Sequence, residues 1–171
     1  MRISVWQRLD VFARGLAPTF VTLLLLILSL LPTRLPGFSV VAPALTLMSV
    51  YYWAIHRPDL LPIWAAFSFG LLQDLLTGAP PGSYATVMLL AYGLVITQRR
   101  FFHGKSFPVV WWGFMMIAAG SSLVHWSLLS VLGGGVMDPW PVIFSYFMSV
   151  AVYPLITWIF VRVHRTLPGQ V

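Results

Sequence analysis

The chain has 171 residues, of which 59% are hydrophobic and only 8% are charged, and its mean hydropathy is +0.88. Ordinary soluble domains are about one quarter charged, so this composition excludes a cytosolic enzyme, a disordered tail and a soluble nucleic-acid-binding protein. There is no cysteine, which excludes disulfides and thiolate metal sites, and the net charge of +6 is typical of cations gathered at a cytoplasmic membrane surface.

The first stretch, residues 1–15, has apolar side chains three residues apart, at Ile3, Trp6, Leu9 and Phe12. This spacing predicts an amphipathic helix that lies on the inner membrane surface, and the alternative is a plain extension of the first membrane span. No small-x-small cleavage pattern follows the next apolar run directly, so we expect the first span to be retained.

Six apolar stretches reach or approach the roughly 17 to 25 residues that a helix needs to cross about 30 Å of hydrocarbon. They are residues 16–31, 38–55, 60–77, 83–98, 107–132 and 140–161. The sequence therefore predicts an all-α polytopic membrane protein with six short transmembrane helices. Its domains are a cytoplasmic interfacial segment over residues 1–15, a transmembrane domain over residues 16–161 and a cytoplasmic tail over residues 162–171.

The cations predict the orientation, because short loops rich in Lys and Arg stay in the cytoplasm. With the N terminus inside, all of the 10 Lys and Arg residues except Arg34 fall on the cytoplasmic side. We therefore expect both termini to be cytoplasmic. Most tryptophans, among them Trp53 beside Tyr51 and Tyr52, lie near predicted span ends, where an indole can bury its ring and keep its N–H hydrated.

Asp74 is the chief polar candidate within a span, because an ionised Asp costs about 3 kcal/mol at the bilayer centre. Helical spacing places Gly70, Asp74 and Gly78 on one stripe, where glycine lets another backbone come close. One interpretation is a polar anchor that fixes helix packing or binds a partner helix, and the alternative is an acid hydrated at the outer interface. On the first interpretation, Asp74→Ala would leave the protein abundant but without function.

The turn after Asp74 reads Gly78-Ala79-Pro80-Pro81-Gly82, which is too short and rigid for a flexible loop. Proline fixes φ and glycine permits tight geometry, so this turn predicts an antiparallel hairpin of spans three and four.

His125 is the second polar candidate, at the end of a small-residue face that includes Gly113 and Gly120. It either meets Asp74 across the bundle or hydrogen-bonds to a neighbouring backbone or hydroxyl group. No pair of His residues has metal-ligand spacing, and the common nucleotide, metalloprotease and serine-hydrolase signatures are absent. With only four acidic residues in the chain, we expect no catalytic residue, no metal and no cofactor.

The segment 69–85, FGLLQDLLTGAPPGSYA, resembles the signature segment of the MreD rod-shape-determining family. That signature has Gly-Leu-Leu-x-Asp-Leu, then Gly-x-Pro-x-Gly and a small residue that opens the next helix. Gln73 and Pro81 stand where members often have aliphatic residues. The matching positions, which with His125 form the expected partner or packing site, are Gly70, Asp74, Gly78, Pro80 and Gly82.

The resemblance implies a non-enzymatic, multi-pass protein of the bacterial inner membrane that supports rod shape and lateral peptidoglycan synthesis as a scaffold. As partners it implies membrane lipid, the bitopic protein MreC and, through it, the actin-like MreB, the glycosyltransferase RodA and a penicillin-binding transpeptidase, with no nucleic acid. The family is thought to be similar in fold to substrate-binding subunits of vitamin uptake transporters. The alternative is therefore a small-molecule-binding uptake subunit, and the pair Ala13 and Ala17 resembles the spacing by which such subunits dock.

Overall fold

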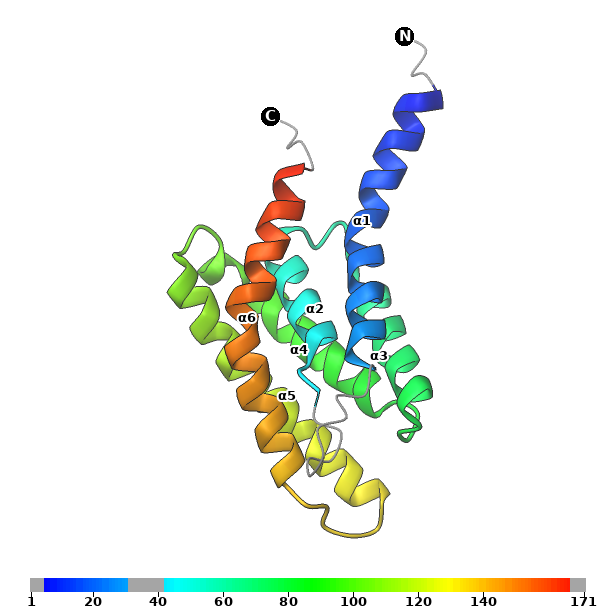
Figure 1. Ribbon diagram of the computed structural model, residues 1–171, viewed down its shortest axis with the longest axis vertical. Coiled ribbons are helices and arrows are strands. Elements are labelled where there is room, and N and C mark those ends of the chain that lie inside the picture. The colour runs from blue at the N-terminus through cyan, green and yellow to red at the C-terminus, as the bar shows by residue number, and fades with distance from the viewer. Residues whose placement is uncertain (1–4, 31–41, 167–171) are drawn as a thin grey trace.

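The computed structural model describes residues 5–30 and 42–166, with side chains described over residues 16–30 and 42–162. Within these residues the chain forms six α-helices and no strand, which confirms the predicted all-α class (Figure 1). The helices are α1 (Val5–Ser29), α2 (Leu45–His56), α3 (Ile63–Thr77), α4 (Ser83–Phe102), α5 (Phe107–Leu132) and α6 (Trp140–Thr166).

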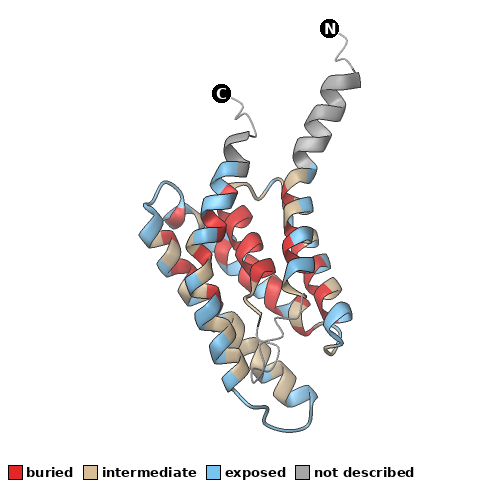
Figure 2. Cartoon of the chain, in the orientation of Figure 1, coloured by how far each residue is buried: buried red, intermediate tan, exposed pale blue. Residues whose placement is uncertain are grey.

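Helix α2 lies at the centre of the bundle, and every residue from Leu45 to Ile55 is buried (Figure 2). Helices α1, α4, α5 and α6 all contact it. Two of its polar side chains bond to these neighbours: Ser49 Oγ lies 2.7 Å from Thr22 Oγ1, and the Tyr51 hydroxyl donates to Val110 O at 2.8 Å. Buried polar groups need such partners, so these contacts fix the rotation of α2 within the bundle.

Aromatic rings pack around α2 and form much of the core. Tyr51 meets Phe114 and Tyr153 edge to face, with ring centroids 5.5 and 6.0 Å apart, and Tyr52 lies 4.9 Å from Phe160. Trp53 is fully buried inside the bundle. The prediction that Trp53 keeps its N–H hydrated near a span end is therefore wrong, because its indole is enclosed within the bundle.

Helix α2 begins at Leu45 and has 12 residues, whereas the sequence predicts a span over residues 38–55. Residues 38–41 lie outside the described part of the chain. Pro43 cannot donate a backbone hydrogen bond, which favours a helix start directly after it. Side chains of α6 hold the preceding segment, because Ser149 Oγ accepts from Ala44 N at 2.8 Å and Ser145 Oγ donates to Ala42 O at 2.7 Å.

Helix α1 runs without a break from Val5 to Ser29. The backbone of residues 5–15 thus forms one helix with the predicted first span, which agrees with the alternative interpretation, and does not form a separate helix. The position of residues 1–15 at the membrane surface stays a prediction. Helices α4 and α6 extend beyond the predicted spans at their C-terminal ends, to Phe102 and Thr166.

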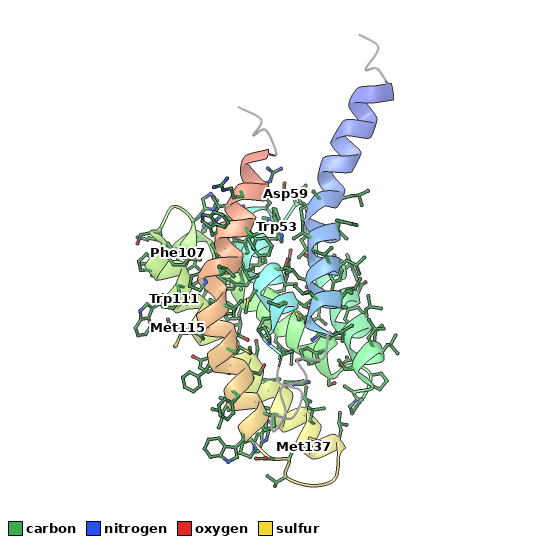
Figure 3. All side chains as sticks on the ribbon, viewed as in Figure 1. Trp53, Asp59, Phe107, Trp111, Met115 and Met137 are labelled. Atoms are coloured by element: carbon green, nitrogen blue, oxygen red, sulfur yellow. The ribbon has the colours of Figure 1, made fainter. Side chains whose placement is uncertain are left out.

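Two of the described helices are long and apolar enough to cross a membrane, namely residues 107–132 and 140–162. The apolar segments 16–29 and 63–77 are shorter. The start of α1 and the end of α6 lie at the same end of the bundle (Figure 1). Asp59 lies toward that end and Met137 lies at the opposite one (Figure 3).

Candidate functional site between helices α3 and α4

Helices α3 and α4 form the predicted hairpin, and its turn depends on two glycines with positive φ. Gly78 has φ of 69° at the C-terminus of α3, and Gly82 has φ of 99° immediately before α4. Ala79 N donates to Asp74 O at 3.1 Å, and Ser83 N donates to Pro80 O at 3.2 Å. The turn is therefore closed by its own backbone.

The carboxylate of Asp74 lies against the N-terminus of α4 and is fully buried. Its Oδ1 accepts from Ser83 Oγ at 2.8 Å and from Tyr84 N at 2.9 Å. Its Oδ2 accepts from Gly82 N at 2.9 Å, from Tyr84 N at 3.1 Å and from Ala85 N at 3.3 Å. The interpretation of an acid hydrated at the outer interface is wrong, because the chain itself surrounds the carboxylate.

This contact supplies hydrogen-bond acceptors for the backbone N–H groups at the start of α4. The first N–H groups of a helix have no partner within the helix, and Gly82 at the N-cap has no side chain to supply one. Asp74 supplies the acceptor from α3 and also places a negative charge at the positive end of the helix dipole. Hydrogen bonds to a charged group contribute about 1.5–3 kcal/mol each, so together they offset an insertion cost of about 3 kcal/mol.

Gly70 lies one turn before Asp74, where α3 and α4 touch. A Cβ atom at this position would lie 2.6 Å from Ala85 Cα and 2.9 Å from Tyr84 O. The absent side chain lets the two backbones approach closely enough for Asp74 to reach the start of α4. Gly70, Asp74, Gly78, Pro80 and Gly82 are thus brought together in one hairpin, and any contact with a partner stays a prediction.

His125 does not contact Asp74 directly. Its ring packs on the ring of Tyr84, with centroids 4.1 Å apart, and the backbone N–H of Tyr84 donates to Asp74. Its Nε2 atom is buried and has no hydrogen-bond partner among the described residues. The structure therefore shows neither a direct ion pair nor a bond from this atom to backbone or hydroxyl.

The small-residue face that leads to His125 has two different environments. At Gly113, an added Cβ would lie 2.6 Å from the Tyr51 hydroxyl, so this glycine packs inside the bundle. At Gly120 nothing lies within 4 Å of that position. The N-terminal half of α5, around Gly113, is therefore packed inside the bundle, and the helix face at Gly120 is open.

Three residues of the site were not singled out from the sequence: Ser83, Tyr84 and Ala85 supply most of the donors to Asp74. A signal for them existed, because a helix that begins after glycine needs an acceptor from elsewhere. In the part of the chain that the structure describes, no group of three His, Cys, Asp or Glu residues could hold a metal ion.

Comparison with known proteins identifies the family. The family model described as rod shape-determining protein MreD matches residues 10–163. The rod shape-determining protein MreD of Haemophilus influenzae is 25% identical over 118 residues, which cover 61% of this chain and 73% of that protein. No solved structure matches the chain. The chain that forms this hairpin with its buried Asp74 therefore belongs to the MreD family of rod shape-determining proteins.

Proposed function

We propose that this protein is a non-enzymatic, multi-pass component of the bacterial inner membrane that holds proteins of the cell-elongation machinery together. Membership of the rod shape-determining family supports the biological role. The comparisons lend no support to the alternative of a vitamin uptake subunit.

One observation carries the proposal of a structural rather than an enzymatic role. Asp74 is the one buried acid in the described part of the chain, and its two oxygens accept from four donors. A carboxylate has about four lone-pair positions, so this one has no free position from which to abstract a proton. The residue that the sequence marks as most costly to bury is used to join two helices.

The surface of the bundle supports placement in the membrane. Large apolar side chains on five of the six helices are more than half exposed, including Phe20 at 66%, Trp64 at 77%, Phe101 at 61%, Met116 at 71% and Leu155 at 63%. A water-soluble protein rarely exposes so much apolar surface, whereas lipid or partner helices cover it at no cost. We propose that all six helices lie in the bilayer, with both termini in the cytoplasm.

The proposed partners are MreC and, through MreC, the actin-like MreB, RodA and a penicillin-binding transpeptidase. The scaffold role predicts that the tagged protein, purified from membranes in a mild detergent, brings MreC with it in a fixed ratio. Depletion of the protein should turn rod-shaped cells round and lower the amount of MreC-bound RodA.

The control for this experiment is a tagged membrane protein of similar size, expressed at the same level and purified in the same way. If depletion abolishes rod shape but the purified protein never brings MreC with it, the scaffold role would be contradicted and the role in determining rod shape would remain. Normal rods after complete depletion would contradict the proposed function as a whole.

A further inference from the structure

The C-terminal half of helix α6 has two different faces. The inward face consists of buried side chains, namely Ser149, Tyr153, Ile156, Thr157 and Phe160. The outward face consists of exposed side chains that follow the i, i+3, i+4 and i+7 spacing of one side of a helix, namely Leu155, Trp158, Ile159 and Arg162. We call these four residues the α6 stripe. It is apolar along most of its length and ends in a cation.

The guanidinium group of Arg162 lies over the indole ring of Trp158, one helical turn earlier. Its Cζ atom is 4.8 Å from the ring centroid, and Trp158 is 59% exposed. A cation–π contact of this kind holds the arginine side chain along the stripe. The contact itself uses none of the guanidinium N–H donors, and an oxyanion such as a phosphate accepts hydrogen bonds from several of them at once.

The charge of the whole chain makes this end of α6 complementary to an anion. The sequence has 10 Lys and Arg residues against four Asp, and its net charge is +6. Two of the four acids are already engaged, because Asp59 lies 3.3 Å from Arg57 and Asp74 accepts from Ser83 at the start of α4. The cations therefore outnumber the acids that could pair with them within the chain.

The position of Arg162 along α6 matches the depth of a lipid headgroup. Arg162 is the last residue of the 23-residue segment 140–162, which is long and apolar enough to cross a membrane. A helix of this length measures about 34 Å, and the hydrocarbon layer is about 30 Å thick. One leaflet of about 15 Å corresponds to about ten helical residues, so a lipid with its phosphate at Arg162 lays its acyl chain over Trp158 and Leu155.

We propose that the α6 stripe binds an anionic phospholipid, whose phosphate bonds to Arg162 and whose acyl chain packs on Trp158 and Leu155. A free phosphate ion would use Arg162 alone, whereas a phospholipid uses the whole stripe. An anionic headgroup fits better than a zwitterionic one, because the latter would bring its own ammonium group close to Arg162. The inference rests on the proposed function only for the placement of α6 in the bilayer.

The test is photo-labelling of the full-length protein in phosphatidylcholine nanodiscs that contain a small fraction of photoactive lipid. This lipid is either phosphatidylglycerol or phosphatidylcholine, with a diazirine in the same acyl chain. Cyanogen bromide cleaves after methionine, so residues 149–171, which include the α6 stripe, are released after Met148 as one fragment for mass spectrometry. We expect phosphatidylglycerol to label this fragment several-fold more than phosphatidylcholine, and unlabelled phosphatidylglycerol to compete.

Arg162→Gln is the decisive variant, because it removes the charge at an exposed position where folding does not depend on it. We expect phosphatidylglycerol labelling of the fragment to fall about fivefold, the effect of one cation at an anionic headgroup, while phosphatidylcholine labelling stays the same. Arg162→Lys keeps the charge and should keep most of the labelling. The matched control is Arg100→Gln, the same change at an exposed position on α4, which should label this fragment as the unchanged protein does.

A second variant tests the ring that holds the arginine. Trp158→Leu keeps an apolar side chain on the stripe but removes the cation–π contact, so it should lower phosphatidylglycerol labelling about twofold or more. Its unfolding temperature should equal that of the unchanged protein, since the indole is mostly exposed.

Three results would overturn the proposal. Equal labelling by the two lipids, or equal phosphatidylglycerol labelling of the unchanged protein and Arg162→Gln, would show that the stripe has no headgroup preference. Competition by water-soluble glycerol phosphate would assign Arg162 to a free anion, and a fragment that neither lipid labels would assign the stripe to a second copy of the chain. The nanodisc contains no other protein, so the lipid site and the recovery of MreC are tested independently.

Discussion

At the scale of single residues, Asp74 shows how an acid is accommodated in an apolar bundle. The carboxylate is fully buried, yet it faces backbone N–H groups at the start of a helix rather than hydrocarbon. Its charge is therefore compensated by dipoles of the same chain. This changes the expectation for Asp74 variants, because loss of the carboxylate leaves several buried donors without an acceptor.

We predict that Asp74→Asn lowers the free energy of unfolding by about 2–4 kcal/mol, since the amide loses the charge and turns N–H groups toward other donors. Thermal unfolding in detergent measures this loss, and immunoblotting of membranes should show reduced abundance. The control is Asp138→Asn, in an exposed loop where Oδ1 accepts only a 3.2 Å bond from Trp140 N among the described residues. Equal stability of the two variants would contradict the capping role.

At the scale of helices, close approach of α3 and α4 depends on Gly70. We predict that Gly70→Ala forces the helices apart and destabilises the protein by about 1–3 kcal/mol or more, because the new methyl group meets rigid backbone at 2.6 Å. Gly120→Ala is the matched control, since nothing lies within 4 Å there and alanine favours a helix by about 1 kcal/mol. The test is to compare the thermal unfolding temperatures of the two variants with that of the unchanged protein. An unchanged unfolding temperature for Gly70→Ala would show that α3 and α4 can separate at no cost in stability.

The turn before α4 needs glycine at position 82 for its backbone dihedral angle, not because a side chain there would clash with a neighbour. Gly82 has φ of 99°, and nothing lies within 4 Å of a Cβ added there. We predict that Gly82→Ala costs about 1–2 kcal/mol through backbone strain alone. Gly93→Ala, within α4 and equally open, should stabilise the protein by about 1 kcal/mol through helix propensity, as at Gly120. A lower unfolding temperature of Gly82→Ala than of the unchanged protein then reports the strain.

At the scale of the whole molecule, the start of α1, the end of α6 and the loops that follow α2 and α4 lie toward one end of the bundle (Figure 1). Arg99 on α4 donates from Nε to Ile55 O at 3.1 Å, which brings two of the cationic segments together. This arrangement agrees with the distribution of charge in the sequence. An even number of membrane crossings follows if every helix spans the bilayer.

We therefore predict that reporter fusions after Arg57, Lys105 and Arg165 behave as cytoplasmic, and that fusions near Gly82 and Gly134 behave as external. Alkaline phosphatase and a fluorescent protein, each active on only one side of the membrane, give complementary readouts. An external signal at Lys105 would contradict the proposed orientation, and the controls are the same reporters fused to a membrane protein of known topology.

Local properties of the sequence determined the helical class, the hairpin and the importance of Asp74. Apolar stretches separated by Pro, Gly and charge specify helices through short-range interactions, and Gly78, Pro80 and Gly82 specify a tight turn because few other residues adopt its backbone angles. The cost of burying a charge distinguishes Asp74 from the other residues of its span on the sequence alone.

The tertiary structure decided which apolar surfaces face protein and which face outward. Hydropathy cannot distinguish these two environments, because a buried core and lipid are equally apolar. The sequence therefore predicts an ordinary span with an interfacial end for helix α2, although Trp53 is fully buried and the helix lies at the centre of the bundle. The partners of Asp74 and the ring contact of His125 with Tyr84 join residues from different helices, and only the packing of the whole chain brings such residues together.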